Sequence, residues 1–322
     1  MMMPMQNIVS VSLPILLSFL VCVFLMPVLI PLLRRLKFGQ SILEIGPNWH
    51  AKKSGTPTMG GIGFIVSSVA VALILGFSAD VMLAAGFAVL CGLIGFADDF
   101  IKVCLKRNMG FNPKQKTACL IVAILAFMFA SHSLGITDTG IYVPFFRAEV
   151  DFGFWYFPLV FFMIMATVNS VNLTDGIDGL AGSVTSVVCV FFAILAFVMR
   201  RVELAYFACA LLGSLMAFLI FNLNPAKVFM GDTGSLFLGG ALAAIAVLLK
   251  QPLIIVLVGL IYLIETASVI IQVTFFKLTG KRVFKMSPIH HHFEMCGWKE
   301  NKIVLVFSTV TIVMCILAFF SL

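Results

Sequence analysis

The stretch FWYFPLVFFMIMATVNSVNLTDGIDGLAGSVTSVVCVFFAILAFV, Phe154 to Val198, holds two apolar runs separated by a polar segment. The runs cover approximately residues 154–171 and 179–199. A run of about 20 apolar residues is long enough for a helix to cross the hydrocarbon core of a bilayer. Residues 169–178, around this break, contain two aspartates and two asparagines. We therefore expect two membrane helices joined by a polar turn at the membrane surface.

Similar runs recur along the whole chain of 322 residues, of which 61% are hydrophobic and 11% are charged. The apolar share of a soluble domain is about half. Ten runs are expected to span the membrane, at approximately 8–33, 57–77, 80–97, 117–135, 154–171, 179–199, 202–221, 234–249, 252–276 and 303–322. A backbone in lipid must satisfy its own hydrogen bonds, so the runs form helices. The sequence predicts an all-α polytopic integral membrane protein, with residues 1–322 in a single membrane domain.

Several segments carry further expectations. The first run has no basic start and no small-residue cleavage site, so we expect a retained helix and not a signal peptide. The ninth run is long and contains Glu265; we expect it to bend or leave the bundle, and we expect its acid to find a partner. Segment 136–153 is expected to form a small outer hairpin. The eight cysteines show no CxxC spacing, which favours free, buried thiols.

The distribution of cations predicts the orientation. Seventeen of the 21 lysines and arginines fall in alternate loops, at residues 34–53, 102–116, 227 and 277–302. An excess of positive charge marks the cytoplasmic side, so both termini are expected outside. The same one-sided charge could attract anionic substrates or lipid headgroups.

Five of the 14 acidic residues lie at the expected cytoplasmic ends of helices: Asp98, Asp99, Asp175, Asp178 and Asp232. Helix capping would explain an Asp-Thr pair before a helix. It explains Asp98-Asp99 poorly, because two adjacent carboxylates at a helix C-terminus oppose the macrodipole and each other. Carboxylates that gather despite repulsion usually share a cation, and oxygen ligands suit Mg²⁺ or Mn²⁺. We therefore expect a metal-assisted site at this membrane surface.

Basic side chains accompany the acids. Lys102 lies one turn beyond the Asp98-Asp99 pair, and Lys114 and Lys116 precede the fourth run. Mg²⁺ and lysines together typically hold a diphosphate, because both neutralise charge on phosphoryl oxygens. No GxxxxGK[ST] loop is present, which excludes a P-loop ATPase. The consecutive histidines 290–292 spread too widely on a helix to share one zinc ion, so we expect them to act as hydrogen bonders or charge stabilisers.

Five motifs occur in order: KSGTPTMGG from Lys53, FADDFIK from Phe96, NSVNLTDGIDGLAG from Asn169, FMGDTGSLFLGG from Phe229 and PIHHHFE from Pro288. In this combination the chain resembles the bacterial phospho-N-acetylmuramoyl-pentapeptide transferase family, within the polyprenyl-phosphate N-acetylhexosamine-1-phosphate transferase superfamily. The resemblance runs from about residue 46 to 302. It implies an enzyme that moves phospho-MurNAc-pentapeptide from UDP-MurNAc-pentapeptide to undecaprenyl phosphate, giving lipid I and UMP.

The resemblance also implies a Mg²⁺ cofactor and a multi-pass protein of the bacterial inner membrane with a cytoplasmic active site. It implies no nucleic-acid partner. The oligomeric state stays open, with a homodimer as one option. Asp232 matches the Mg²⁺-contacting aspartate, and Asp98 and Asp99 match an essential pair. Asp98 is our candidate for the group that deprotonates or positions the lipid phosphate. Direct attack is favoured over a covalent relay, since the incoming phosphate is already an anion.

Other residues carry over from the motifs. Phe229 would stack on uracil, and Leu173 and Gly176 would complete the wall of that pocket. His291 joins the three aspartates as a catalytic residue. The residues expected to bind substrate are Lys53, Thr58, Lys102, Lys114, Asn169, Asn172, Leu173, Asp175, Gly176, Asp178, Asn222, Phe229, His290 and His292.

Three other functions share part of this pattern. A polyprenyl-phosphate GlcNAc-1-phosphate transferase shares the acidic motifs, but GTPTMGG and HHHFE favour the muramoyl substrate. A transporter would place ionisable groups near the bilayer midplane, whereas these lie at one edge. A CDP-alcohol phosphotransferase needs a DGxxAR pattern, which fails because Gly182 follows Asp178-Gly179-Leu180-Ala181.

Overall fold

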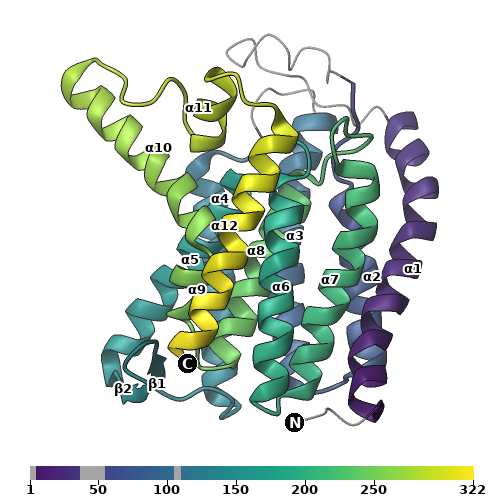
Figure 1. Cartoon of the computed structure of the whole chain (residues 1–322), viewed down its shortest axis with the longest axis vertical. Helices are drawn as coiled ribbons and strands as arrows, with labels where there is room; N and C mark the ends of the chain where they lie inside the picture. Colours follow the sequence, from purple (N-terminus) through teal and green to yellow (C-terminus); the bar gives the residue numbers. More distant parts are fainter. Residues whose placement is uncertain (1–4, 37–54, 105–109) are drawn as a thin grey trace.

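The fold is seen in a computed structural model of the chain that describes residues 5–36, 55–104 and 110–322. Within this part of the chain the helices are α1 (Met5–Arg35), α2 (Gly61–Leu75), α3 (Ala79–Cys104), α4 (Pro113–Ser133), α5 (Tyr156–Thr174), α6 (Leu180–Val198), α7 (Val202–Asn222), α8 (Gly231–Leu248), α9 (Ile254–Val258), α10 (Leu260–Thr279), α11 (Ile289–Met295) and α12 (Glu300–Ser321), with a short 3₁₀ turn at Gly153–Trp155. They form one bundle of long helices (Figure 1).

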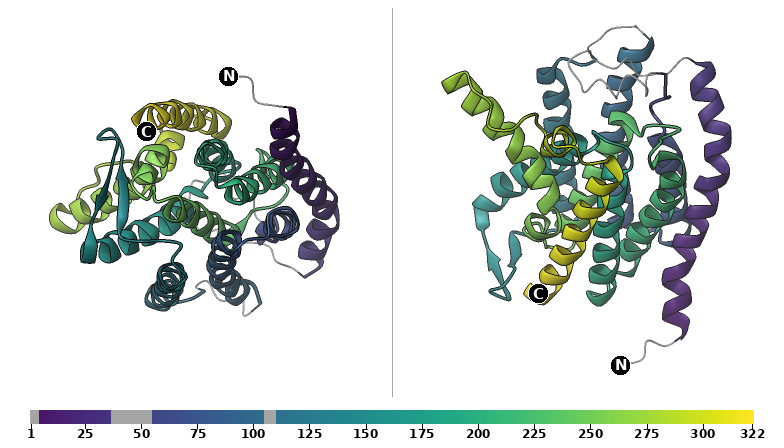
Figure 2. Two further views of the ribbon diagram at one scale, coloured as in Figure 1. Left: turned by 90° about the horizontal axis from the view of Figure 1, so that it is seen from below. Right: turned by 45° about the horizontal axis from the view of Figure 1, so that its top comes forward.

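Nine of the helices in the described part of the chain are long and apolar enough to cross a membrane. The prediction of an all-α polytopic membrane protein is confirmed. The expected second run corresponds to α2, which at 15 residues is shorter than the others. The ninth run is divided, because α9 ends at Val258 and α10 begins at Leu260. Figures 1 and 2 show α10 leaving the bundle obliquely, as expected for that run.

Helix α8 forms the centre of the bundle. Every residue from Thr233 to Leu248 is buried, and the helix packs against α2, α3, α5, α6 and α9. Its sequence GDTGSLFLGGALAAIAVL is rich in glycine and alanine, and small residues let membrane helices approach closely. A Cβ built on Gly95 of α3 would lie only 2.1 Å from the carbonyl oxygen of Asp232. The absence of a side chain at Gly95 therefore allows α3 to carry its carboxylates to the first turn of α8.

The expected outer hairpin is present. Strands β1 (Gly140–Val143) and β2 (Ala148–Asp151) pair antiparallel. The Tyr142 hydroxyl donates to the Leu322 carbonyl at 2.7 Å, and Lys250 Nζ lies 2.6 Å from Asp138 Oδ2 and 3.2 Å from Glu149 Oε1. The hydrogen bond from Lys250 holds the pKa of Asp138 below its usual value. The hairpin thus fastens the end of α12 and the turn after α8 together.

The start of α1, the end of α12 and the hairpin all lie at one end of the bundle, at the bottom of Figure 1. The last turn of α3 and helix α11 lie at the opposite end. Both ends of the described chain are therefore on one side of the bundle, and the polar motifs are on the other side.

Candidate active site

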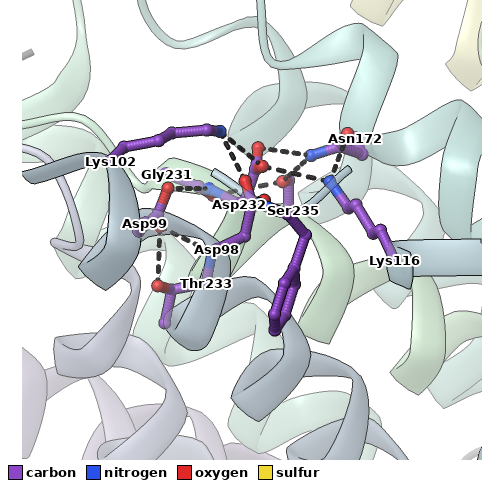
Figure 3. Close-up of polar contacts among 10 residues, drawn as sticks. Asp98, Asp99, Lys102, Lys116, Asn172, Gly231, Asp232, Thr233 and Ser235 are labelled. Carbon is purple, nitrogen blue, oxygen red and sulfur yellow. Dashed lines mark hydrogen bonds and ion pairs between the residues drawn. The ribbon is translucent and has the colours of Figure 1, made fainter. Parts of the chain in front are cut away.

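Three acidic side chains meet where α3 ends and α8 begins. Asp98, Asp99 and Asp232 each offer a carboxylate oxygen, and these oxygens lie within 4.8 Å of one another. Figure 3 shows them together with Lys102, on the last turn of α3, and Lys116, on the first turns of α4. Two helix ends thus bring together residues 98 and 232, as the sequence predicted.

Asp232 is the most heavily coordinated of the three. Its Oδ2 lies 2.9 Å from Lys102 Nζ and 3.0 Å from Lys116 Nζ. Its Oδ1 accepts a hydrogen bond of 2.9 Å from Asn172 Nδ2, which also donates to Ser235 Oγ at 2.7 Å. One carboxylate therefore gathers two ammonium groups and an amide from three different helices (Figure 3).

Asp98 pairs with Lys102, Nζ to Oδ2 at 2.5 Å. Its Oδ1 accepts a hydrogen bond of 2.6 Å from the backbone N–H of Phe111. The side chain is buried, so both oxygens are held by charge-assisted contacts, which are stronger than neutral ones. These contacts fix the carboxylate at the edge of the cluster.

Asp99 has a different role in the fold. Its Oδ2 accepts from the Thr233 backbone N–H at 2.9 Å and from the Thr233 hydroxyl at 2.7 Å, and its Oδ1 accepts from the Asp232 N–H at 3.3 Å. The carboxylate thus caps the N-terminus of α8, where the helix dipole favours a negative charge. Capping in trans explains how two adjacent acids are tolerated at the end of α3, because each faces its own set of donors.

The loop after α5 is tied to the loop before α8. Asp178 Oδ2 accepts from Asn224 Nδ2 and from the Ala226 N–H, each at 3.0 Å. Asn222 accepts from the Gly179 N–H at 3.1 Å and donates to the Val228 carbonyl at 2.9 Å. Both side chains are buried, so in this fold they join the two loops.

Asp175 directly follows α5, close enough to Asp232, Asp99 and Asp178 for their charges to act on it. Burial, followed by repulsion from the charges of Asp232, Asp99 and Asp178, raises the pKa of Asp175 to about 8. A carboxyl group with such a pKa holds its proton through most of the neutral range.

The three consecutive histidines face three different partners. His290 is fully buried and its Nδ1 lies 3.0 Å from Oε2 of Glu265, which is fully buried too. His291 Nδ1 lies 2.6 Å from Glu294 Oε2, and His292 Nδ1 accepts from the Lys285 N–H at 3.1 Å. The carboxylate group described above is the one candidate metal cluster found among the described residues, and it includes no histidine.

His290 is the partner of Glu265, the acid in the ninth run. Its ring fills the space next to Gly176, where a Cβ would lie 2.1 Å from Nε2. His290 on α11 therefore contacts both Glu265 on α10 and Gly176 in the loop after α5. Position 176 has to be glycine because the imidazole occupies the side-chain space.

The other predicted residues are placed as follows. Thr58 is buried beside Gly231, and the Asn169 amide turns back to the Met165 carbonyl of its own helix at 2.8 Å. Leu173 and Phe229 are partly exposed. Lys53 lies outside the described residues. These placements do not test the expected contacts with substrate, which stay predictions.

Lys116 was not among the predicted ligands, whereas Lys114 was. Lys114 is exposed, and its backbone N–H takes part in the capping box of Asn112 at the start of α4. Residues two positions apart on a helix point to different faces. The Asn112-Pro113 start signal in the sequence could have placed both lysines on α4, but which one faces α8 depends on how α4 packs.

Comparison with known proteins places the chain among transferases. Residues 81–250 match the model of glycosyl transferase family 4. A phospho-N-acetylmuramoyl-pentapeptide-transferase of Clostridium botulinum (strain Alaska E43) is 50% identical over 312 residues, covering 96% of this chain and 95% of that protein. The chain belongs to the phospho-N-acetylmuramoyl-pentapeptide-transferase family. The Clostridium perfringens (strain 13) member is 49% identical over 97% of this chain and 99% of its own length.

A third member of the family, from Halalkalibacterium halodurans, is 48% identical over 96% of both chains. The resemblance inferred from the five motifs is confirmed, and the chain is an enzyme. Membership of this transferase family removes the transporter alternative. Because the similarity covers 96% of this chain, it includes the acidic cluster as well as α10 and α11.

Proposed function

We propose that this protein transfers phospho-MurNAc-pentapeptide from UDP-MurNAc-pentapeptide to undecaprenyl phosphate, releasing UMP and forming lipid I with the help of Mg²⁺. The observation that carries the proposal is the cluster of Asp98, Asp232, Lys102 and Lys116 at one end of a multi-pass helical bundle. The identity of the transferred group comes from the names of the relatives, which share about half of their residues with this chain.

The donor set suits a hard cation. The three aspartates offer carboxylate oxygens only, and oxygen ligands are those that Mg²⁺ prefers. Asp232 and Asp98 would hold the ion, and Asp99 would support them, because its oxygens are engaged by the first turn of α8. When bound, Mg²⁺ supplies charge neutralisation for the diphosphate.

The lysines supply the rest of the positive charge. Lys102 and Lys116 reach the same carboxylate oxygen of Asp232 from opposite sides. Their ammonium groups are therefore able to contact the two phosphates of a UDP-sugar, which must approach the cluster edge. Charge that develops on the leaving UMP is stabilised there by groups already in position.

The bond changes favour a direct transfer. A phosphate oxygen of the lipid forms a bond to the sugar-linked phosphorus, while the bond from that phosphorus to the UMP oxygen breaks, and UMP leaves with the electron pair. The lipid phosphate is already an anion, so a covalent relay offers little advantage. Asp98 is held by Lys102 and by the Phe111 amide, and this position suits a role in orienting charge at the cluster.

The charge distribution supports a cytoplasmic active site in a bacterial inner membrane. Basic residues concentrate in the loops at the end of the bundle that carries the cluster, which is the cytoplasmic end by the positive-inside rule. The donor and the released UMP are water-soluble nucleotides, and the acceptor is a membrane lipid. A site at the end of the bundle is accessible both to the water-soluble donor and to the lipid acceptor.

Labelled substrate tests the proposal. The full-length protein should release UMP from UDP-MurNAc-pentapeptide when Mg²⁺ and undecaprenyl phosphate are both present, and should not release it when either is omitted. Equal turnover of UDP-GlcNAc would favour the GlcNAc-1-phosphate transferase instead. Replacing Asp232→Asn should lower the rate about 10²–10³-fold, as loss of a key electrostatic contact does. A variant that keeps more than about a tenth of the rate would contradict the metal role.

A further inference from the structure

The end of α10 and the segment that returns from it project from the molecule. Figure 1 and the right view of Figure 2 show this end of the helix standing clear of the bundle. Every residue from Val273 to Val283 is exposed. We refer to residues 273–285 as the basic arm.

The charge of the basic arm has one sign. It carries Lys277, Lys281, Arg282 and Lys285, and no acidic residue occurs between Glu265 and Glu294. Among the described residues, no carboxylate forms an ion pair with the first three of these cations. Their charge is therefore available to an external anion.

Large apolar side chains lie among the cations. Phe275 is 40% exposed, Phe276 50% and Leu278 79%. Apolar side chains next to lysine and arginine are typical of helices at a membrane interface, where the rings enter the acyl region and the cations extend to the headgroups. A surface facing only water would gain nothing from exposing these rings.

The basic arm is held in shape by its own contacts. Gln272 Oε1 accepts hydrogen bonds from the backbone N–H groups of Val283 at 3.1 Å and Phe284 at 2.9 Å, and its Nε2 donates to the Phe284 carbonyl at 3.3 Å. The chain reverses at Gly280, whose φ of 69° lies in the left-handed region. The three cations are thus presented by a fixed turn.

The helix that carries the basic arm contacts α5 and α11 two turns before the arm begins. On α10, Glu265 contacts His290, and Thr266 Oγ1 donates to Ser170 Oγ of α5 at 2.7 Å. From there the helix runs outward at the end of the bundle that holds the acidic cluster (Figure 1). Its exposed Ile270 and Ile271 continue the lipid-facing surface of the membrane helices into the arm.

We infer that the basic arm binds anionic phospholipid headgroups of the leaflet on the active-site side, with Lys277, Lys281 and Arg282 on the phosphates and the apolar side chains among the first acyl carbons. Lysine and arginine next to an anionic leaflet each strengthen binding about fivefold. An arm that gathers phosphate-bearing lipids next to α5 would also raise the local concentration of a lipid-phosphate acceptor. That consequence rests on the proposed function, whereas the headgroup binding does not.

The test compares two triple variants of the full-length protein with equal loss of charge. The arm variant is Lys277→Gln, Lys281→Gln and Arg282→Gln. The control variant removes three other exposed cations from loops or helix ends on the same side of the bundle, by Arg34→Gln, Lys227→Gln and Lys299→Gln. Lipid binding is measured by native mass spectrometry in neutral detergent, with phosphatidylglycerol and phosphatidylcholine titrated separately.

We expect the arm variant to lose at least tenfold in apparent affinity for phosphatidylglycerol, with binding of phosphatidylcholine unchanged and the control variant close to wild type. Equal losses in the two variants, or no loss in either, would overturn the inference, because the effect would then follow net charge or another surface. Thermal unfolding in the same detergent confirms that both variants are folded. The measurement needs no turnover, so it stands even if the transferase assay fails. In vesicles, the arm variant should raise the KM for the lipid acceptor and leave the KM for the nucleotide sugar unchanged.

Discussion

The neighbouring aspartates of the FADDFIK motif should respond differently to the same substitution. Asp99→Asn removes the negative charge that caps α8, which costs about 0.3–2 kcal/mol. The asparagine oxygen can still accept from the Thr233 N–H and hydroxyl, but its NH₂ group then faces the Asp232 N–H. That weak contact, 3.3 Å in the wild type, is lost at a cost of about 1 kcal/mol. We therefore expect Asp99→Asn to lower the free energy of unfolding by about 1–3 kcal/mol.

Asp98→Asn should leave stability nearly unchanged. The asparagine oxygen can still accept from the Phe111 N–H, and Lys102 keeps its second partner, Asp232. The Lys102 side chain is 39% exposed, so the lost ion pair is worth less than about 1 kcal/mol. Activity should nevertheless fall about 10²-fold or more, because the charge at the edge of the cluster is gone.

Two measurements on each variant distinguish these effects. Thermal unfolding in detergent reports stability, and UMP release at saturating substrates reports the rate. Asp99→Ala extends the series, because it leaves three donors of α8 unsatisfied in a buried place, and each costs about 1–3 kcal/mol. The order of stability should be Asp98→Asn above Asp99→Asn above Asp99→Ala. If Asp98→Asn and Asp99→Asn unfold at the same temperature, the capping role of Asp99 is wrong.

Three further outcomes are expected. Lys116→Gln should lower kcat about 10²-fold, whereas Lys299→Gln, at an exposed position outside the acidic cluster, should stay within about threefold in the same assay. Gly176→Ala should destabilise the protein and raise the KM for the nucleotide sugar, because the new methyl group would meet the His290 ring; wild-type values for both quantities would contradict that packing. Without added Mg²⁺, thermal stability should fall as the pH rises from about 4 through 8, since the pKa of Asp175 in the folded state, about 8, exceeds its value of about 4 in an unfolded chain. Asp175→Asn should flatten this slope, and an unchanged slope in that variant would assign the effect to another group.

The local pattern of hydrophobic and charged residues was enough to predict the class of fold and the end of the bundle that carries the site. The length of an apolar run is a property of neighbouring residues, so the helices could be located without knowing what packs against them. Acids directly after such runs had to lie at helix ends, which is why Asp98, Asp99 and Asp232 could be expected at one membrane surface. The length of the ninth run and the Glu265 within it also predicted that the run would bend or leave the bundle, and the short segment 136–153 between two runs predicted the outer hairpin.

Contacts between residues that are distant in the sequence could not be predicted from this local pattern. Asp99 caps a helix that begins more than 130 residues later, Glu265 meets a histidine from α11, and Lys116 rather than Lys114 reaches Asp232. Each outcome depends on the rotation of one helix against another and on close approaches at small residues such as Gly95. Periodicity along one helix states which residues share a face, but the packing of the bundle decides what that face meets, because close packing selects one rotation among several that the apolar pattern permits.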